Sequence, residues 1–197
     1  MSLNLSGFKS GETHNFSDLS EPISYQCINC GVCCNRLLID RQGVRKGLPL
    51  LPDEIDIFRK AHVRPAYGIG KSPKDSGFKV IAYQMRLNFC PHRRFGGCVM
   101  HAYRPAICRS YPFVPVINQG FKVVKTFDLT CTALKDHVKG YFMGAVPVQS
   151  SSVEVENSSY PAVASITERL LNDVGSSWFY NLKTGRWVPF RNLLPPE

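Results

Sequence analysis

Four cysteines within eight residues constrain this chain more than any other feature of its sequence. Residues 27–34 read Cys-Ile-Asn-Cys-Gly-Val-Cys-Cys, a C-x2-C-x2-C-C run. Thiolates spaced this closely suit zinc or an iron–sulfur cluster, since both take soft sulfur ligands. Four further cysteines bring the total to eight. The sequence therefore predicts a metal-binding protein whose candidate ligands are Cys27, Cys30, Cys33, Cys34, Cys90, Cys98, Cys108 and Cys131.

The cysteines could instead form disulfides or stay as unliganded structural thiols. Residues 1–20 are polar and lack the apolar segment of a secretory signal. No apolar run reaches the roughly 18 residues that a membrane helix needs. We therefore expect a cytoplasmic protein without a membrane partner, in which thiols stay reduced. Under those conditions CxxC spacing favours metal ligation over disulfides.

The basic charge of the chain is concentrated in its middle. Of the formal net charge of +9, residues 35–139 carry +12, from 19 Lys/Arg and 7 Asp/Glu. Such a basic region is typical of proteins that bind nucleic acid or an acidic partner. Thiolate ligands would lower the net charge, because the formal count treats cysteines as neutral. The residues expected on an RNA-binding or ribonucleoprotein-binding face are Arg36, Arg41, Arg45, Lys46, Arg93 and Arg94.

The sequence predicts a small, loop-rich α+β fold nucleated by its metal. We expect a flexible arm over residues 1–22, a cysteine-cluster domain over 23–147, and an appendage over 148–197 that begins with a serine-rich linker. A helix over 161–174 has Pro161 in its first turn and a regular apolar stripe. A β-hairpin follows, with Lys183-Thr184-Gly185 as its turn.

Shorter elements are expected within the cysteine domain. Strands are predicted at residues 37–39, 78–85 and 121–127, and short helices at 52–61 and around 132–141. Residues 62–77 contain Gly and Pro throughout, which predicts a loop. Trp178, Tyr180 and Trp187 of the hairpin could stack on bases, but aromatic residues of this kind more often pack a small tail onto a domain.

The spacing leaves the identity of the metal open. Three cysteines at x2 spacing with a distant Cys-Pro, here Cys90-Pro91, resemble the start of a four-iron cluster motif. Zinc sites use the same C-x2-C pairs. Cys33 and Cys34 are adjacent, so we expect their side chains to diverge and to serve two sites. One division places Cys27, Cys30, Cys33 and Cys90 at one site, and the other four cysteines at a second.

The segment over residues 90–113 completes a resemblance to a known family. After the C-x2-C-x2-C-C run come Cys90, Cys98, Arg104-Pro105, Cys108-Arg109 and Tyr111-Pro112. In this order they resemble the CxxCxxCC (YkgJ-type) cysteine-cluster family, described as zinc- or iron-chelating. The resemblance covers residues 25–131 and implies metal chelation by the cysteines. One relative, flagellin lysine N-methylase, is a methyl-transfer enzyme with an iron–sulfur cluster, but this chain has no glycine-rich nucleotide loop.

Charged neighbours of the cysteines have roles of their own. Arg104 and Arg109 flank Cys108 and could offset the charge of an anionic cluster, or form ordinary structural ion pairs. His92 and His101 lie close enough to cysteines to be considered as ligands. Two classes of function follow: a cluster-dependent oxidoreductase or methyl-transfer enzyme, and a zinc-stabilised module that binds RNA. A metal store that releases its ion to chelators is a third.

Overall fold

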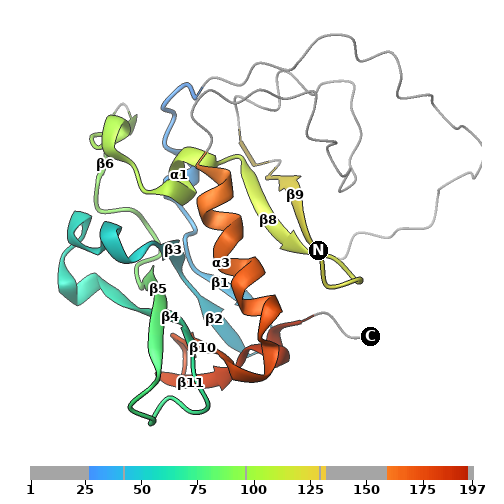
Figure 1. Cartoon of the computed structure of the whole chain (residues 1–197). Helices are drawn as coiled ribbons and strands as arrows, with labels where there is room; N and C mark the ends of the chain where they lie inside the picture. The colour runs from blue at the N-terminus through green and yellow to red at the C-terminus, as the bar shows by residue number, and fades with distance from the viewer. Residues whose placement is uncertain (1–26, 42, 96, 129, 132–158, 195–197) are drawn as a thin grey trace, which may run out of the picture.

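The computed structural model describes residues 27–41, 43–95, 97–128, 130–131 and 159–194, which form a mixed fold of many strands and few helices (Figure 1). This composition is consistent with the expected α+β class. The predicted arm over 1–22, the serine-rich linker and the helix around 132–141 lie outside the described residues. None of the described helices is long and apolar enough to cross a membrane.

A five-stranded antiparallel sheet is the largest unit, with the order β11-β10-β4-β5-β3. Its strands are β3 (Leu48–Leu50), β4 (Val63–Ile69), β5 (Lys79–Met85), β10 (Ser177–Asn181) and β11 (Arg186–Pro189). The predicted C-terminal hairpin is therefore present. It extends the sheet that β3, β4 and β5 begin, whereas the sequence led us to expect an appendage packed alongside. The domain boundary at residue 148 stays a prediction.

Two strands were not predicted from the sequence, and one of them lies in residues expected to form a loop. β4 occupies residues predicted as a loop, and β8 (Phe113–Ile117) pairs with β9 (Val123–Phe127). The register of β4 shifts between Pro65 and Tyr67, which is where a sheet tolerates a proline. Gly68 lies so close to the Phe78 ring that a methyl group there would clash. Pro65 and Gly68, which suggested a loop, are thus part of a strand.

Short elements connect the sheet to the cysteine segments. These are β1 (Ile39–Arg41) and β2 (Val44–Lys46), β6 (Arg93–Arg94) and β7 (Gly97–Cys98), α1 (Ala106–Ser110), and 3-10 turns at Val32–Cys34, Pro52–Ile57, Lys60–His62, His101–Tyr103, Val174–Ser176 and Phe190–Leu193. The helix predicted at 52–61 is thus a 3-10 turn over its first six residues. The long helix α3 (Tyr160–Asn172) packs against α1 and β8 and buries Val163, Ala164 and Leu170.

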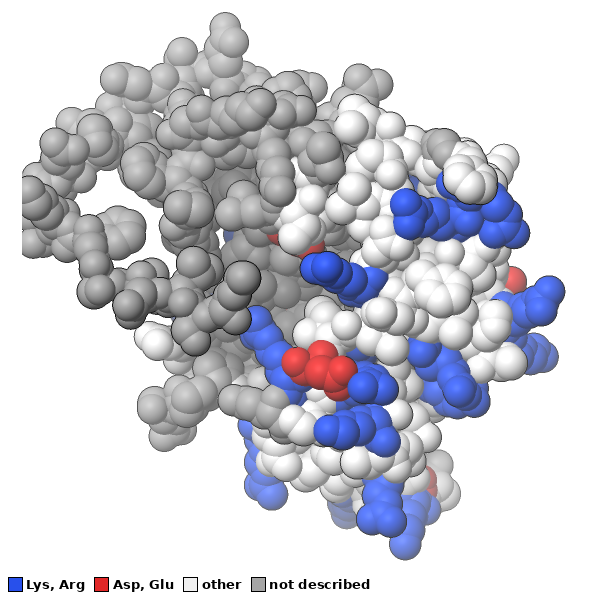
Figure 2. Space-filling model, turned by 180° about the vertical axis from the view of Figure 1, so that it is seen from behind, with Lys and Arg blue, Asp and Glu red and all other residues white. Residues whose placement is uncertain are grey.

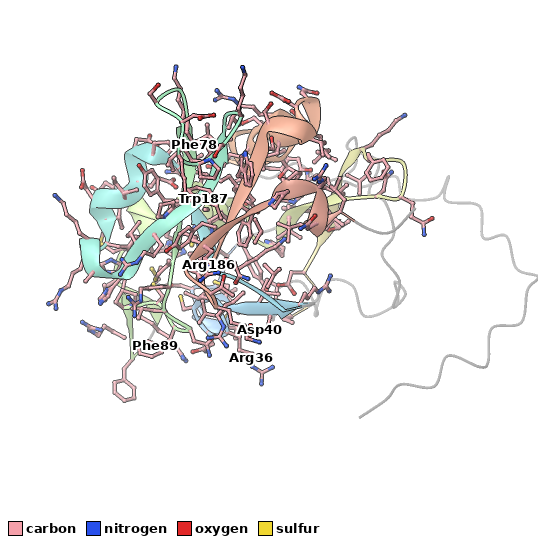
Figure 3. All side chains as sticks on the ribbon, turned by 90° about the horizontal axis from the view of Figure 1, so that it is seen from below. Arg36, Asp40, Phe78, Phe89, Arg186 and Trp187 are labelled. Atoms are coloured by element: carbon pink, nitrogen blue, oxygen red, sulfur yellow. The ribbon has the colours of Figure 1, made fainter. Side chains whose placement is uncertain are left out.

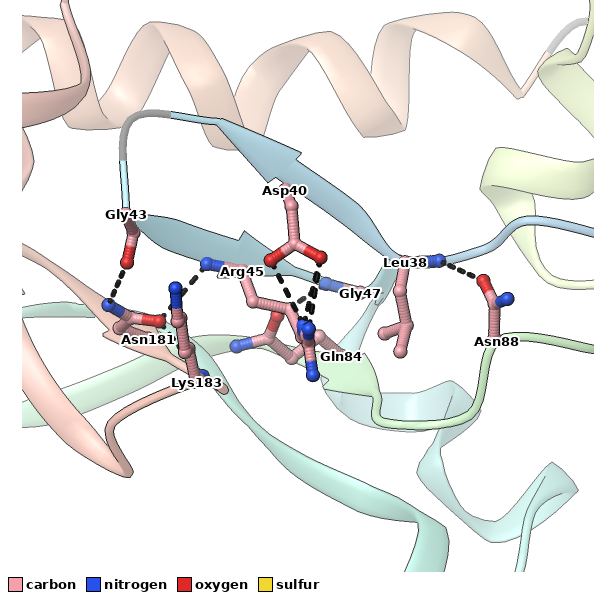
Figure 4. A network of polar contacts seen from close by, with 9 residues as sticks. All are labelled: Leu38, Asp40, Gly43, Arg45, Gly47, Gln84, Asn88, Asn181 and Lys183. Carbon is pink, nitrogen blue, oxygen red and sulfur yellow. Dashed lines mark hydrogen bonds and ion pairs between the residues drawn. The ribbon is translucent and has the colours of Figure 1, made fainter.

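Polar side chains join hairpins that are far apart in sequence (Figure 4). Asn181 accepts hydrogen bonds from the backbone N–H groups of Arg45 and Lys183 and donates to the Gly43 carbonyl. Arg45 also pairs with Asp40 across the β1–β2 hairpin at 3.0 Å. These contacts fix the β1–β2 hairpin against the C-terminal hairpin.

The hydrophobic core next to the cysteines consists of Leu37, Leu50, Phe58 and Met85. Cys90 and Ile57 pack against this cluster. The core thus forms one wall of the region where the cysteine segments meet. The hairpin aromatics are packed as well: the Trp187 ring lies 4.9 Å from Phe78 and 5.4 Å from Tyr180 between centroids (Figure 3).

Candidate metal centre

The first cysteine run folds as a tight loop ending in a 3-10 turn. Gly31 precedes the turn Val32–Cys34 with φ of 71°, the left-handed region that glycine adopts without strain. A Cβ atom there would also lie 3.1 Å from Nε of Arg93. The turn brings Cys33 and Cys34 back toward the residues that precede it.

The second cysteine segment is held directly on this loop. The backbone N–H of Cys90 donates to the Cys34 carbonyl at 2.9 Å, and that of Cys98 donates to Oδ1 of Asn29 at 2.8 Å. Gly97 has φ of 124° and lies so close to the Asn29 carbonyl that a Cβ atom would clash at 2.1 Å. Asn29 therefore positions Cys98, a role that nothing in the sequence indicated.

Cys108 and Cys131 come from two other elements. Cys108 lies in α1, whose first backbone N–H, that of Ala106, donates to the buried carboxylate of Glu54 at 2.5 Å. Cys131 follows β9, and its N–H donates to the carbonyl of Asp128, whose own N–H donates to Pro112. Glu54 is a second positioning residue that the sequence did not single out, although it forms the reciprocal bond to Leu51 N–H of a helix start.

All eight cysteines line a single cavity of about 40 Å³. A cavity of this size is larger than the roughly 10–15 Å³ that one water molecule needs. Leu37, Ile57 and Phe58 of the hydrophobic core form its apolar wall. The fold thus brings together every cysteine that the sequence proposed as a ligand.

The thiols of Cys33, Cys34 and Cys90 are in direct contact. Cys34 is hydrogen-bonded to both of the others. These bonds lower the pKa of Cys33 to about 7 and that of Cys90 to about 6, and they raise the pKa of Cys34. The expectation that Cys33 and Cys34 diverge is wrong, because their thiols are hydrogen-bonded to each other. The contact also joins residues from both proposed four-cysteine sets, so the geometry does not separate two sites.

The pKa values of two other thiols are raised by burial. The two thiols are those of Cys98 and Cys108, and the effect is stronger for Cys108. Negative charge on the neighbouring Cys33 and Cys90 also disfavours the thiolate form of Cys108. Without a cation, the cavity therefore cannot hold all its cysteines as thiolates. A bound metal would supply the missing positive charge.

Arg104 provides a positive charge at the cavity wall. Its Nη1 donates to Sγ of Cys27 at 3.3 Å, and its Nε donates to the His101 carbonyl at 2.8 Å. Its charge favours the thiolate of Cys33 and lowers the pKa of that group. Arg109, the other arginine beside Cys108, instead donates to Oγ of Ser159. Of these two arginines, Arg104 is therefore the one that lies beside the cysteines.

The two histidines near the cysteines differ. Nε2 of His101 lies 3.5 Å from Sγ of Cys27, whereas Nε2 of His92 lies 2.9 Å from the Ile57 carbonyl. His92 is thus held by the backbone, while His101 faces the cysteines. Within the described residues, however, no group of three or more Cys, His, Asp or Glu side chains is arranged to hold a metal ion. The thiols are gathered, but a coordination polyhedron is not formed.

No family model matches the chain. It is 28% identical over 107 residues to the uncharacterized protein MJ0661 of Methanocaldococcus jannaschii, a match that covers 54% of each chain. The chain thus spans about half the length of this relative. No solved structure matches.

Proposed function

We propose that this protein binds a metal centre through its cysteine thiolates. The single observation that supports the proposal is that eight cysteines from four separate parts of the chain line one cavity. Unliganded thiols have no need to gather in this way, and soft thiolates are the ligands that zinc and iron–sulfur clusters use. The resemblance to the CxxCxxCC family points to the same chemistry.

The donor set fits such a centre in charge as well as in chemistry. The pKa values of Cys33 and Cys90 are lowered, and Arg104, whose charge favours the thiolate of Cys33, would offset part of the negative charge of a thiolate-bound cluster. The candidate ligands are the eight cysteines, and His101 lies within reach of Cys27. A four-iron cluster would supply one-electron redox chemistry, whereas zinc would stabilise the fold.

We favour the iron–sulfur cluster, with zinc as the alternative. The C-x2-C-x2-C spacing with the distant Cys90-Pro91 is the pattern of a four-iron motif, and Cys90 contacts Cys34 in the first run. A cluster-dependent oxidation or methyl transfer would be consistent with this choice.

Metal analysis after anaerobic purification tests the proposal. We expect brown protein with about four iron and four sulfide per chain and the corresponding visible and EPR spectra. Colourless protein with one or two tightly held zinc ions would show that the metal is zinc and not an iron–sulfur cluster. Protein that is folded, metal-free and fully reactive toward thiol reagents would contradict metal binding altogether.

Variants identify the ligands. Cys33→Ser and Cys90→Ser are expected to lower the metal content severely, because each removes a soft ligand from the wall of the cavity. Met100→Leu is the matched control, since Met100 also lines the cavity but is replaced by an apolar side chain of similar size. It should retain the metal.

A further inference from the structure

Exposed apolar side chains gather on the segments that carry the cysteines. Among the described residues, nine large hydrophobic side chains are exposed, and six of them lie within residues 28–34 and 89–103. Three are aromatic: Phe95 is fully exposed, Tyr103 is 75% exposed and Phe89 is 61% exposed. Figure 3 shows Phe89 projecting away from the ribbon. The six are Ile28, Val32, Phe89, Phe95, Val99 and Tyr103.

The same segments are basic and lack carboxylates. Residues 27–39 and 86–110 contain six arginines but no lysine, aspartate or glutamate, and no acidic residue occurs anywhere from 76 to 127. Arg36, Arg93 and Arg94 are all exposed. On the face drawn in Figure 2, blue Lys and Arg groups alternate with uncharged atoms and red groups are sparse.

Two contacts join the segments that carry these residues. Nη1 of Arg93 donates to Oδ1 of Asn35 at 2.6 Å, and the backbone of Asn35 forms a β-bridge with Phe89. Arg36 follows Asn35, and Arg94 and Phe95 follow Arg93 at the tip of the β6–β7 hairpin. We call these residues the Arg–Phe surface: Arg36, Phe89, Arg93, Arg94 and Phe95.

We propose that the Arg–Phe surface binds single-stranded RNA without strong sequence preference. Exposed aromatic rings offer faces on which unpaired bases stack, and arginines between them pair with phosphates. The charge of these segments favours RNA over an apolar protein partner, because arginines without neighbouring carboxylates lie between the exposed rings. The formal charge of +9 has the sign that an RNA backbone requires.

The structure also narrows the basic set that the sequence suggested. Arg45 is paired with Asp40, and Nζ of Lys46 lies 5.5 Å from the centre of the Phe179 ring, with burial lowering its pKa. These two residues are engaged within the fold. Arg36, Arg41, Arg93 and Arg94 are exposed, and of these Arg36, Arg93 and Arg94 lie on the segments that carry the exposed rings. The side chains of Arg93 and Arg94 also donate hydrogen bonds to Asn35 and to the Pro91 carbonyl.

Fluorescence anisotropy with a labelled single-stranded RNA of about 12 nucleotides and mixed sequence tests the proposal. The protein is used as purified, with its metal content measured in parallel. If three arginines contact phosphates, raising salt from about 50 to about 200 mM should weaken binding roughly 20-fold. Phe89→Ala and Phe95→Ala should each weaken it between about 5-fold and 150-fold. In the double variant Arg36→Gln/Arg94→Gln, the affinity for RNA should depend less steeply on salt concentration.

The controls use an exposed ring and an arginine away from this surface. Phe121→Ala and Arg186→Gln should leave RNA affinity unchanged while keeping the same fold by circular dichroism. Three results would overturn the proposal: no binding at protein concentrations up to about 100 µM in low salt, equal loss in control and surface variants, or binding to poly-L-glutamate but not to RNA. The last would indicate an acidic protein partner. Because metal content is measured separately, these results are independent of the proposed metal centre.

Discussion

Gln84 is a buried amide that joins three strands of the sheet through backbone groups. Its Oε1 accepts from Gly47 N–H at 2.8 Å, and its Nε2 donates to the carbonyls of Pro65 and Tyr180 at 2.8 and 2.7 Å. Gln84→Met keeps the volume but leaves these backbone groups without a partner. We expect it to lower the free energy of unfolding by about 3 kcal/mol, measured by urea denaturation. The exposed Gln119→Met should change it by less than about 0.5 kcal/mol.

The buried Tyr67 makes the stability of the fold depend on pH in the alkaline range. Its ring packs against Phe179 and Phe190, and burial raises the pKa of its hydroxyl to about 12 from the ordinary 10.0. The neutral phenol is therefore favoured in the folded state. This stabilisation is complete below pH 10 and is lost as pH rises toward 12, by roughly 2 kcal/mol. Tyr67→Phe should remove this part of the decline when urea midpoints are compared from pH 9 to 12; parallel curves for the two proteins would contradict the assignment.

The sequence identified the candidate ligands at the level of residue type but not their contacts. Cysteine spacing was enough to predict that the residues act together, and all eight line one cavity. The relation of Cys33 to Cys34 could not be read from spacing, because it depends on the 3-10 turn after Gly31. Asn29 was missed for a similar reason: its role depends on Gly97, which is 68 positions away in the chain.

Helices and strands with a regular sequence pattern could be predicted from the sequence, whereas strands that depend on pairing with distant segments could not. The helix α3 and the C-terminal hairpin follow from apolar periodicity and a glycine turn, and both are present. β4 and β8 were missed because Pro65 and Pro115 argue against strands when only local sequence is considered. In the fold, β4 is held between β5 and β10, so pairing on both sides overrides local preference.

The β6–β7 hairpin contains Cys98 and is held against the first cysteine run by Asn29. Gly97→Ala would bring a methyl group against the Asn29 carbonyl at a φ that alanine rarely adopts. We expect the hairpin to move off the cysteine loop and the bound metal per chain to fall, as measured by elemental analysis. Gly77→Ala is the matched control, because a Cβ atom there meets nothing within 4 Å. Equal metal content in the two variants would mean that Cys98 is not a ligand.

The molecule as a whole combines two kinds of structure. The five-stranded sheet is held by continuous backbone pairing and by Gln84. In the described parts of residues 27–38 and 88–110, the regular elements are instead two-residue strands, short 3-10 turns and the five-residue α1. Segments with so few backbone hydrogen bonds open locally at low cost unless something else holds them. The proposed metal centre would be that constraint, because ligands bound to the folded state stabilise it by mass action.

Removal of the metal should therefore affect the two parts unequally. Amide hydrogen exchange measured by mass spectrometry before and after chelation is expected to show faster exchange in residues 27–38 and 88–108. Exchange in β4, β5 and β10 should change much less, because their protection comes from pairing within the sheet. Reloading the metal serves as the control and should restore protection. Unchanged exchange in the cysteine segments would show that the gathered thiols hold themselves in place without a metal, and uniform loss across the sheet would show that the fold is one cooperative unit built on its centre.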